Sequence, residues 1–197
     1  EITVRIVYEG RAAKVILHNS ELQKIEDYYD QCAEEGTNDY QIEESKKAVT
    51  NMNVILGDPD RLKALAEDFV KHYETRIVEG SSVNGKAMFV CSSRPIAYEF
   101  YKNVIQLRPE WAEVKVSEPG VKLTEKEKRE IKPMERIKIV MTRGKDDPEE
   151  MYNLLGTKEY RKELDRQFKN AKSNFKIAII VDMWLTGFDV PSMTTMY

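Results

Sequence analysis

Three short apolar runs in the second half of the chain, at 87–91, 137–141 and 177–181, lack the alternation of a half-exposed strand. Runs of this kind predict strands that are covered on both faces. Stretches with apolar residues three and four positions apart separate the runs and predict helices. Because strands joined by helices usually pair in parallel through right-handed crossovers, the pattern predicts an α/β fold with a parallel sheet.

The connections between these runs also carry signals. Between the second and third runs we expect two helices, the first of them capped at Asp147-Pro148. The stretch 118–136, between the first and second runs, is highly charged, and Thr124 and Glu127 have the spacing of a capping box. We expect this stretch to be a surface insertion that contains a short helix.

The first 80 residues have a different pattern of apolar and polar positions. Apolar and polar positions alternate at the start of the chain and again after a turn at Glu9-Gly10, which predicts a β-hairpin. Three helical patterns follow, and the clearest has Asp58 as its N-cap and Pro59 at its first helical position. We therefore expect two regions, a β-hairpin with a helical segment at 1–80 and a parallel-sheet region at 81–197.

Composition and charge place the chain among soluble globular proteins. Of its 197 residues, 41% are hydrophobic and 33% are charged, and the formal net charge is −3. No apolar stretch is long enough to span a membrane and no secretion signal is visible, so we expect a cytoplasmic protein without a membrane partner. The two cysteines, Cys32 and Cys91, are expected to be reduced and buried. The stretch 158–176 holds seven basic and three acidic residues, which permits a basic contact face.

One glycine-rich stretch imitates a phosphate-binding loop. The sequence from Gly80 to Lys86 matches the pattern G-x-x-x-x-G-K, but Ala87 stands where a hydroxyl residue would bind magnesium. A working loop also follows a strand and opens a helix, whereas a helix precedes this stretch and a strand follows it. We interpret it as a helix stop with a linker. No His or Cys cluster has the spacing of a metal site.

The turn after the third apolar run is the best candidate for ligand contact. It comes at the carboxyl end of a strand, where open α/β sheets place their ligand crevice. Gly187 would let the backbone approach a phosphate or ribose closely, Thr186 offers a hydroxyl, and Asp189 could accept hydrogen bonds from a sugar. An ordinary turn with a buried Trp184 and Phe188 explains the spacing equally well, and both interpretations stay open on the residues alone.

Four segments carry a family resemblance. Residues 176–191, with the string D-M-W-L-T-G-F-D-V-P, resemble motif V of superfamily-two helicases, and residues 86–97 resemble motif IV. Residues 6–11 and 56–61 resemble the region that joins the two RecA-like lobes of such motors. The match is most specific to the motor (R) subunit of type I restriction enzymes.

The resemblance implies a fragment of an ATP-dependent DNA translocase and endonuclease. The chain would contain the inter-lobe region and most of the second RecA-like lobe, truncated after motif V. The parent would use ATP and Mg²⁺, act on double-stranded DNA, and work with methylation and specificity subunits. The phosphate loop, the magnesium acid and the nuclease would lie elsewhere in the parent, so we expect the isolated chain to be inactive. The alternatives are a lobe of another superfamily-two helicase and a non-catalytic α/β interaction module.

The resemblance also implies roles for individual residues, none of them catalytic and none of them a metal ligand. Nucleotide contacts would come from Gly187 and Asp189. DNA-backbone contacts would come from Ser92, Ser93, Arg94, Thr186 and Gly187, with Arg94 as the best single charge for a phosphate. For the two serines, capping of the following helix is an equally good explanation. Since such a lobe would normally continue with another strand, we also expect uncovered apolar surface at Val190, Met193, Met196 and Tyr197.

Overall fold

The computed structural model describes residues 7–10, 56–80, 85–184 and 189–197. The chain divides into two compact units, Glu1–Val49 and Thr50–Tyr197. Of the first unit only residues 7–10 are described, and they are exposed and carry no regular secondary structure. The rest of the expected hairpin and the first two expected helices lie outside the described residues.

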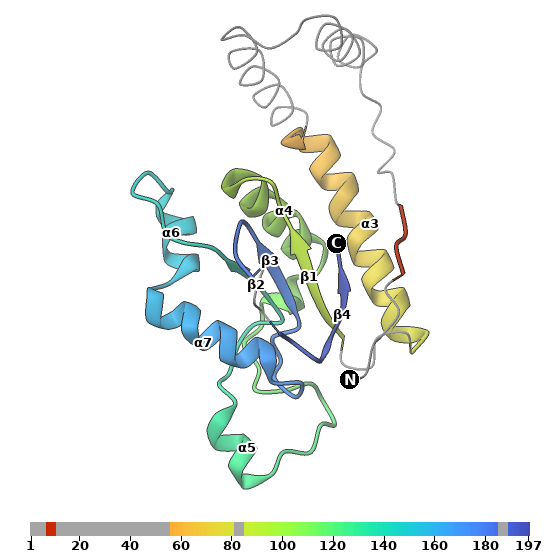
Figure 1. Ribbon diagram of the computed structural model, residues 1–197. Helices are drawn as coiled ribbons and strands as arrows, with labels where there is room; N and C mark the ends of the chain where they lie inside the picture. Colours follow the sequence, from red (N-terminus) through yellow and green to blue (C-terminus); the bar gives the residue numbers. More distant parts are fainter. Residues whose placement is uncertain (1–6, 11–55, 81–84, 185–188) are drawn as a thin grey trace, which may run out of the picture. The chain divides into compact units, whose positions relative to one another are not determined.

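The second unit is built on a sheet of four parallel strands (Figure 1). The strands are β1 (Lys86–Val90), β2 (Ile137–Val140), β3 (Ile177–Ile180) and β4 (Met193–Met196), in the spatial order β2-β3-β1-β4. The first three coincide with the three apolar runs to within one residue at each end. The α/β class with a parallel, RecA-like sheet is thus confirmed.

Helices cover both faces of this sheet, as the unbroken apolar strands require. On one face, α3 (Pro59–Val78), α4 (Arg94–Leu107) and α6 (Glu149–Leu155) pack against the odd-numbered residues of β1, β2 and β3. On the other face, α7 (Lys158–Lys169) packs against the even-numbered residues. The strands are therefore buried from both sides, with Ile137, Ile177 and Ile180 fully inaccessible.

Helix α3 begins as its sequence predicts. The Asp58 side chain accepts a hydrogen bond of 2.8 Å from the amide of Arg61, and Pro59 stands at the first helical position. The buried stripe of α3 includes Phe69, whose ring meets the ring of Phe89 on β1 edge to face at 5.2 Å. Helix α3 therefore packs with the sheet. The expected division of the chain into regions 1–80 and 81–197 stays a prediction.

The charged insertion lies at the amino ends of the strands, below the sheet in Figure 1. A 3₁₀ turn, η1 (Pro109–Ala112), precedes the insertion, and the insertion contains the short helix α5 (Glu125–Glu130). Both hydrogen bonds of the predicted Thr124–Glu127 capping box are present. An ion pair of 2.6 Å between Arg136 and Glu118 ties the two ends of the insertion together.

The end of the chain differs from expectation. Residues 193–196 already form β4, which pairs with β1, so the sheet gains a strand that the sequence analysis did not place. Val190 is buried, and the ring of Tyr197 lies edge to face on Phe69 at 4.9 Å. Much of the expected apolar gap is therefore filled within the chain, and Met196, 55% exposed, is its main open position.

One of the two cysteines, Cys91, lies within the described residues. Cys91 is buried, and desolvation raises the pKa of its thiol to about 12, so the thiol stays protonated. Within the described ranges, no helix is long and apolar enough to cross a bilayer. Cys32 lies outside the described residues, and the cytoplasmic location stays a prediction.

Lys86 is an unusual component of the core. Its side chain is completely buried, and its ammonium donates to the carbonyls of Phe175 at 2.8 Å and Gln167 at 3.2 Å. No described carboxylate forms an ion pair with it. Desolvation, reinforced by the nearby charge of Lys176 and only partly offset by Glu118, lowers the pKa of Lys86 to about 6. This position in β1 supports the rejection of the phosphate-loop pattern.

We predict that Lys86→Met removes part of the pH dependence of stability. Between about pH 6 and the ordinary lysine pKa of 10.5, the unfolded chain holds a proton on Lys86 that the folded chain has lost. The free energy of unfolding should therefore rise with pH in the wild type, by up to about 1.4 kcal/mol per pH unit from this group. Denaturant unfolding across this range should show a flatter profile for the variant. Identical slopes in the two proteins would contradict the assignment.

Candidate functional site

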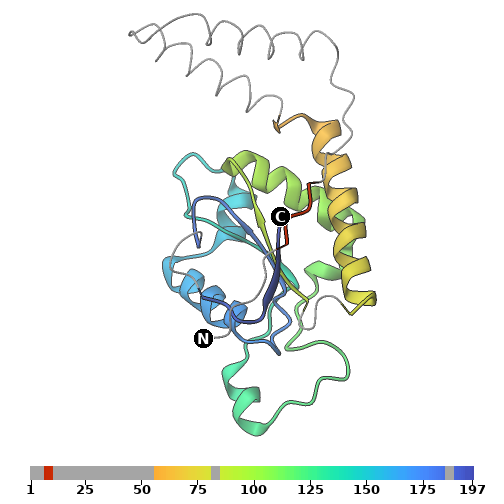
Figure 2. The same cartoon turned by 45° about the vertical axis from the view of Figure 1, so that its right-hand side comes forward.

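Parallel pairing brings three loops to the carboxyl edge of the sheet (Figure 2). Val90 of β1 and Val140 of β2 are both in register with Ile180 of β3, so the loops after these strands begin at the same level. The amide of Cys91 donates to the carbonyl of Ile180 at 2.9 Å, which continues the β1–β3 ladder into the first loop. Segments that resemble motifs IV and V thus leave the sheet side by side.

The loop after β1 presents two serine hydroxyls. Ser92 is exposed, and Ser93 occupies the N-cap position of α4 in an extended conformation. The Ser93 side chain makes no capping hydrogen bond. Ser93 therefore occupies the capping position that the alternative explanation requires, but its hydroxyl does not cap the helix. Contact of the two serines with DNA stays a prediction.

Arg94 is engaged in an ion pair. Its Nη2 donates to both carboxylate oxygens of Asp147, at 2.6 and 2.5 Å, and its Nη1 donates to the carbonyl of Thr142. Asp147 also accepts a hydrogen bond of 2.6 Å from the amide of Gly144. The expectation that Asp147 helps to cap the next helix is wrong, because the N-cap of α6 is Pro148 and the Asp147 carboxylate is used by Arg94 instead.

This contact is closely packed. Burial would raise the pKa of Asp147, but the hydrogen bonds from Arg94 and Gly144 outweigh it and hold the pKa below its usual value, so the carboxylate stays ionised. A Cβ atom added to Gly144 would lie 2.9 Å from Oδ1 of Asp147 and 3.3 Å from Nη2 of Arg94. A glycine is therefore needed for the loop to approach the ion pair this closely.

The loop after β2 contains two cations that the sequence analysis did not single out. The guanidinium carbon of Arg143 lies 4.2 Å from the ring centroid of Tyr152, within the range of a cation–π contact. Lys145 is exposed. The only local signal for them was an Arg-Gly-Lys sequence shortly after a buried strand.

The loop after β3 holds Asp189 at the surface. Asp182 and Trp184 have positive φ angles of 54° and 60°, a conformation that non-glycine residues rarely adopt. The ring of Trp184 stacks on Phe168 of α7 at 5.5 Å, and Val190 is buried, so apolar contacts anchor the described loop on both sides of the exposed Asp189. Thr186 and Gly187 lie outside the described residues.

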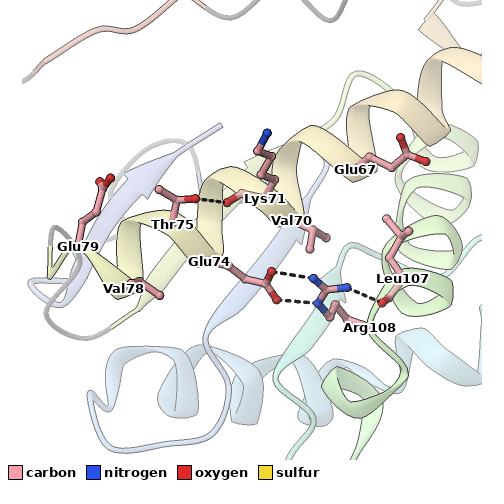
Figure 3. A pocket seen from close by; sticks show the side chains of 9 residues that line it. All are labelled: Glu67, Val70, Lys71, Glu74, Thr75, Val78, Glu79, Leu107 and Arg108. Atoms are coloured by element: carbon pink, nitrogen blue, oxygen red, sulfur yellow. Dashed lines mark hydrogen bonds and ion pairs between the residues drawn. The ribbon is translucent and has the colours of Figure 1, made fainter.

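A separate cavity of about 470 Å³ lies between the carboxyl-terminal parts of α3 and α4 (Figure 3). In its wall, the guanidinium of Arg108 binds both oxygens of Glu74, at 2.6 and 2.7 Å. Since α4 starts at the carboxyl end of β1 and runs back along the sheet, this cavity lies near the opposite edge. It does not coincide with the three loops.

Side chains that could ligate a metal do not cluster within the described ranges. No group of three His, Cys, Asp or Glu side chains in the described ranges could hold a metal ion. Lys86, the lysine of the phosphate-loop pattern, is buried in the core. The Asp189 carboxylate is exposed, as a contact with sugar hydroxyls would require.

The chain is similar to known restriction enzyme subunits. A family model described as type I restriction enzyme subunit R domain 3 matches residues 83–197. The type I restriction enzyme HindI endonuclease subunit of Haemophilus influenzae is 37% identical over 155 residues, which cover 79% of this chain and 13% of that protein. A protein of Methanocaldococcus jannaschii that bears the name type I restriction enzyme MjaIXP endonuclease subunit is 32% identical over an alignment of 198 positions, which covers this whole chain and 16% of that protein. No solved structure matches.

We predict that Gly144→Ala weakens the Arg94–Asp147 contact. The added methyl group would force the Asp147 carboxylate to move, and the free energy of unfolding should fall by about 1–2 kcal/mol. The loss should shrink in an Arg94→Gln background, where the ion pair is already absent. Gly10→Ala is a suitable control, because a Cβ there would meet no described atom within 4 Å. An equal loss in both backgrounds, measured by denaturant unfolding, would contradict the coupling.

Proposed function

Because the chain belongs to the family of type I restriction enzyme R subunits, we propose that it works as the second lobe of a DNA-translocating motor. The family match favours this over a lobe of another superfamily-two helicase and over a non-catalytic interaction module. The chain spans only 13% and 16% of the length of the curated relatives above, so the activity proposed is that of a larger subunit.

The observation that carries the proposal is the convergence of the loops at the carboxyl edge. The loop with Ser92 and Ser93 and the loop with Asp189 follow neighbouring parallel strands, β1 and β3. Hydroxyl groups and cations at such an edge suit the phosphate backbone of double-stranded DNA. A motor that moves along any sequence needs backbone contacts rather than base contacts. Thr186 and Gly187 are proposed to add to these contacts.

ATP and Mg²⁺ are proposed as the cofactors of the larger subunit. In this chain Asp189, with Gly187, would contact the sugar of the nucleotide, while the groups that hold the phosphates and the metal would lie in another lobe. No step of ATP hydrolysis is assigned to the described residues, and the chain by itself is proposed to be inactive. A cytoplasmic complex with methylation and specificity subunits, and a nuclease elsewhere in the R subunit, complete the proposal.

We predict that Asp189→Ala in the R subunit abolishes or strongly slows DNA translocation and leaves folding intact. The side chain is exposed, so its removal leaves no buried cavity, but a contact that links nucleotide to movement would be lost. Translocation can be followed by displacement of a third strand bound downstream on the duplex. Asp146→Ala, at another exposed acid of the same edge, should translocate normally. Normal translocation by Asp189→Ala would remove Asp189 from the site.

A further inference from the structure

Arg94 is poorly placed to bind a ligand phosphate, although its position in the sequence favours it. Nη2 donates to both oxygens of Asp147, and Nη1 donates to the Thr142 carbonyl. The Asp147 side chain is only 8% exposed. If Arg94 turned towards a phosphate, Asp147 would remain as a largely buried carboxylate without its main counter-charge, which is strongly unfavourable.

Arg143, unlike Arg94, is not engaged by a carboxylate of the described residues. No carboxylate in the described part of the chain forms an ion pair with it, and its Nε is buried without a hydrogen-bond partner there. Its guanidinium carbon lies 4.2 Å from the ring centroid of Tyr152, which is itself 42% exposed. The terminal N–H groups of Arg143 make no hydrogen bond or ion pair within the described residues, so they stay available to an acceptor beside this ring contact.

The ion pair of Arg94 also determines where Arg143 lies. Arg94 holds Thr142 through its carbonyl and Asp147 through its carboxylate, and Arg143 lies between them in the chain. Arg94 therefore connects the loop after β1 to the loop after β2 and fixes the segment that carries Arg143. A guanidinium fixed in this way loses little conformational freedom when it binds.

Resting on the proposed function, we propose that Arg143 is the residue that contacts the DNA phosphate backbone at this edge, with Arg94 and Tyr152 as its positioning residues. A fixed guanidinium suits two phosphate oxygens and reads no base sequence. Lys145, exposed two residues further along the same loop, adds positive charge beside it. The phosphates of a nucleotide are the competing source of the same chemistry, so the experiment must separate DNA from ATP.

The test measures binding of the R subunit to a labelled duplex of arbitrary sequence by fluorescence anisotropy between about 50 and 200 mM salt. Arg143→Gln should weaken binding about tenfold at low salt and lower the slope of log Kd against log salt by about 1, the value for one phosphate contact. Arg143→Lys should retain the slope and part of the affinity, because the charge remains without the planar fork. Arg129→Gln, an equal charge change on the exposed α5 at the opposite edge, should bind as the wild type.

Arg94→Gln decides between the two arginines. If Arg94 only positions the loop, this variant should unfold at a lower temperature and keep the wild-type salt slope. A lowered slope in Arg94→Gln with an unchanged slope in Arg143→Gln would overturn the inference and leave the proposed function standing. A raised KM for ATP in Arg143→Gln with unchanged DNA binding would also overturn it, in favour of a nucleotide contact. An R subunit that binds no duplex would contradict the inference and the proposed function together.

Discussion

The in-register parallel pairing of β1, β2 and β3 is the constraint on which the rest of the structure depends. Val90, Val140 and Ile180 leave the sheet at one level, so the three loops that follow must share one edge. Parallel strands need long crossovers, and the helices that provide them cover both faces and bury the apolar strands. The same pairing therefore creates the core and brings together segments from three parts of the chain.

The two edges of the sheet carry charge in different ways. At the amino edge, Arg136 and Glu118 pair across the charged insertion, and the Arg108–Glu74 pair lines the nearby cavity. At the carboxyl edge, the Arg94–Asp147 pair joins two loops and leaves Arg143 without a described carboxylate partner. Ion pairs at both edges fix connections between elements, and at the carboxyl edge Arg143 lies beside such a pair. The convergence of the three loops, with Arg143 in one of them, supports placing the contact with DNA at the carboxyl edge.

Local patterns in the sequence predicted most of the described fold. Unbroken apolar runs indicated the buried strands, and cap residues indicated where α3 and α5 begin, because both signals depend on neighbours in the chain. The pattern Met-Thr-Thr-Met of β4 was too short and too polar to indicate a strand, and only its pairing with β1 makes it one. Lys86 in the core was also invisible, since its partners are carbonyls of Gln167 and Phe175, about eighty to ninety positions away.

The candidate site was predicted less completely, for the same reason. The order of strands and loops indicated that the candidate loops share one edge, but the partner of Arg94 is Asp147, 53 positions further along the chain. An Asp-Pro sequence before a helix usually indicates a cap, and nothing nearby in the sequence indicated that the carboxylate would bind Arg94 instead. Arg143 was overlooked because the sequence does not show that Asp147, the nearby acid, forms its ion pair with Arg94.

The most direct test of the central claim, that the carboxyl edge contacts DNA, is amide hydrogen exchange of the R subunit with and without duplex DNA. The account predicts slower exchange in the loops that follow β1, β2 and β3, and no change around the Arg108–Glu74 cavity. Slower exchange at that cavity, with unchanged exchange in the three loops, would contradict it.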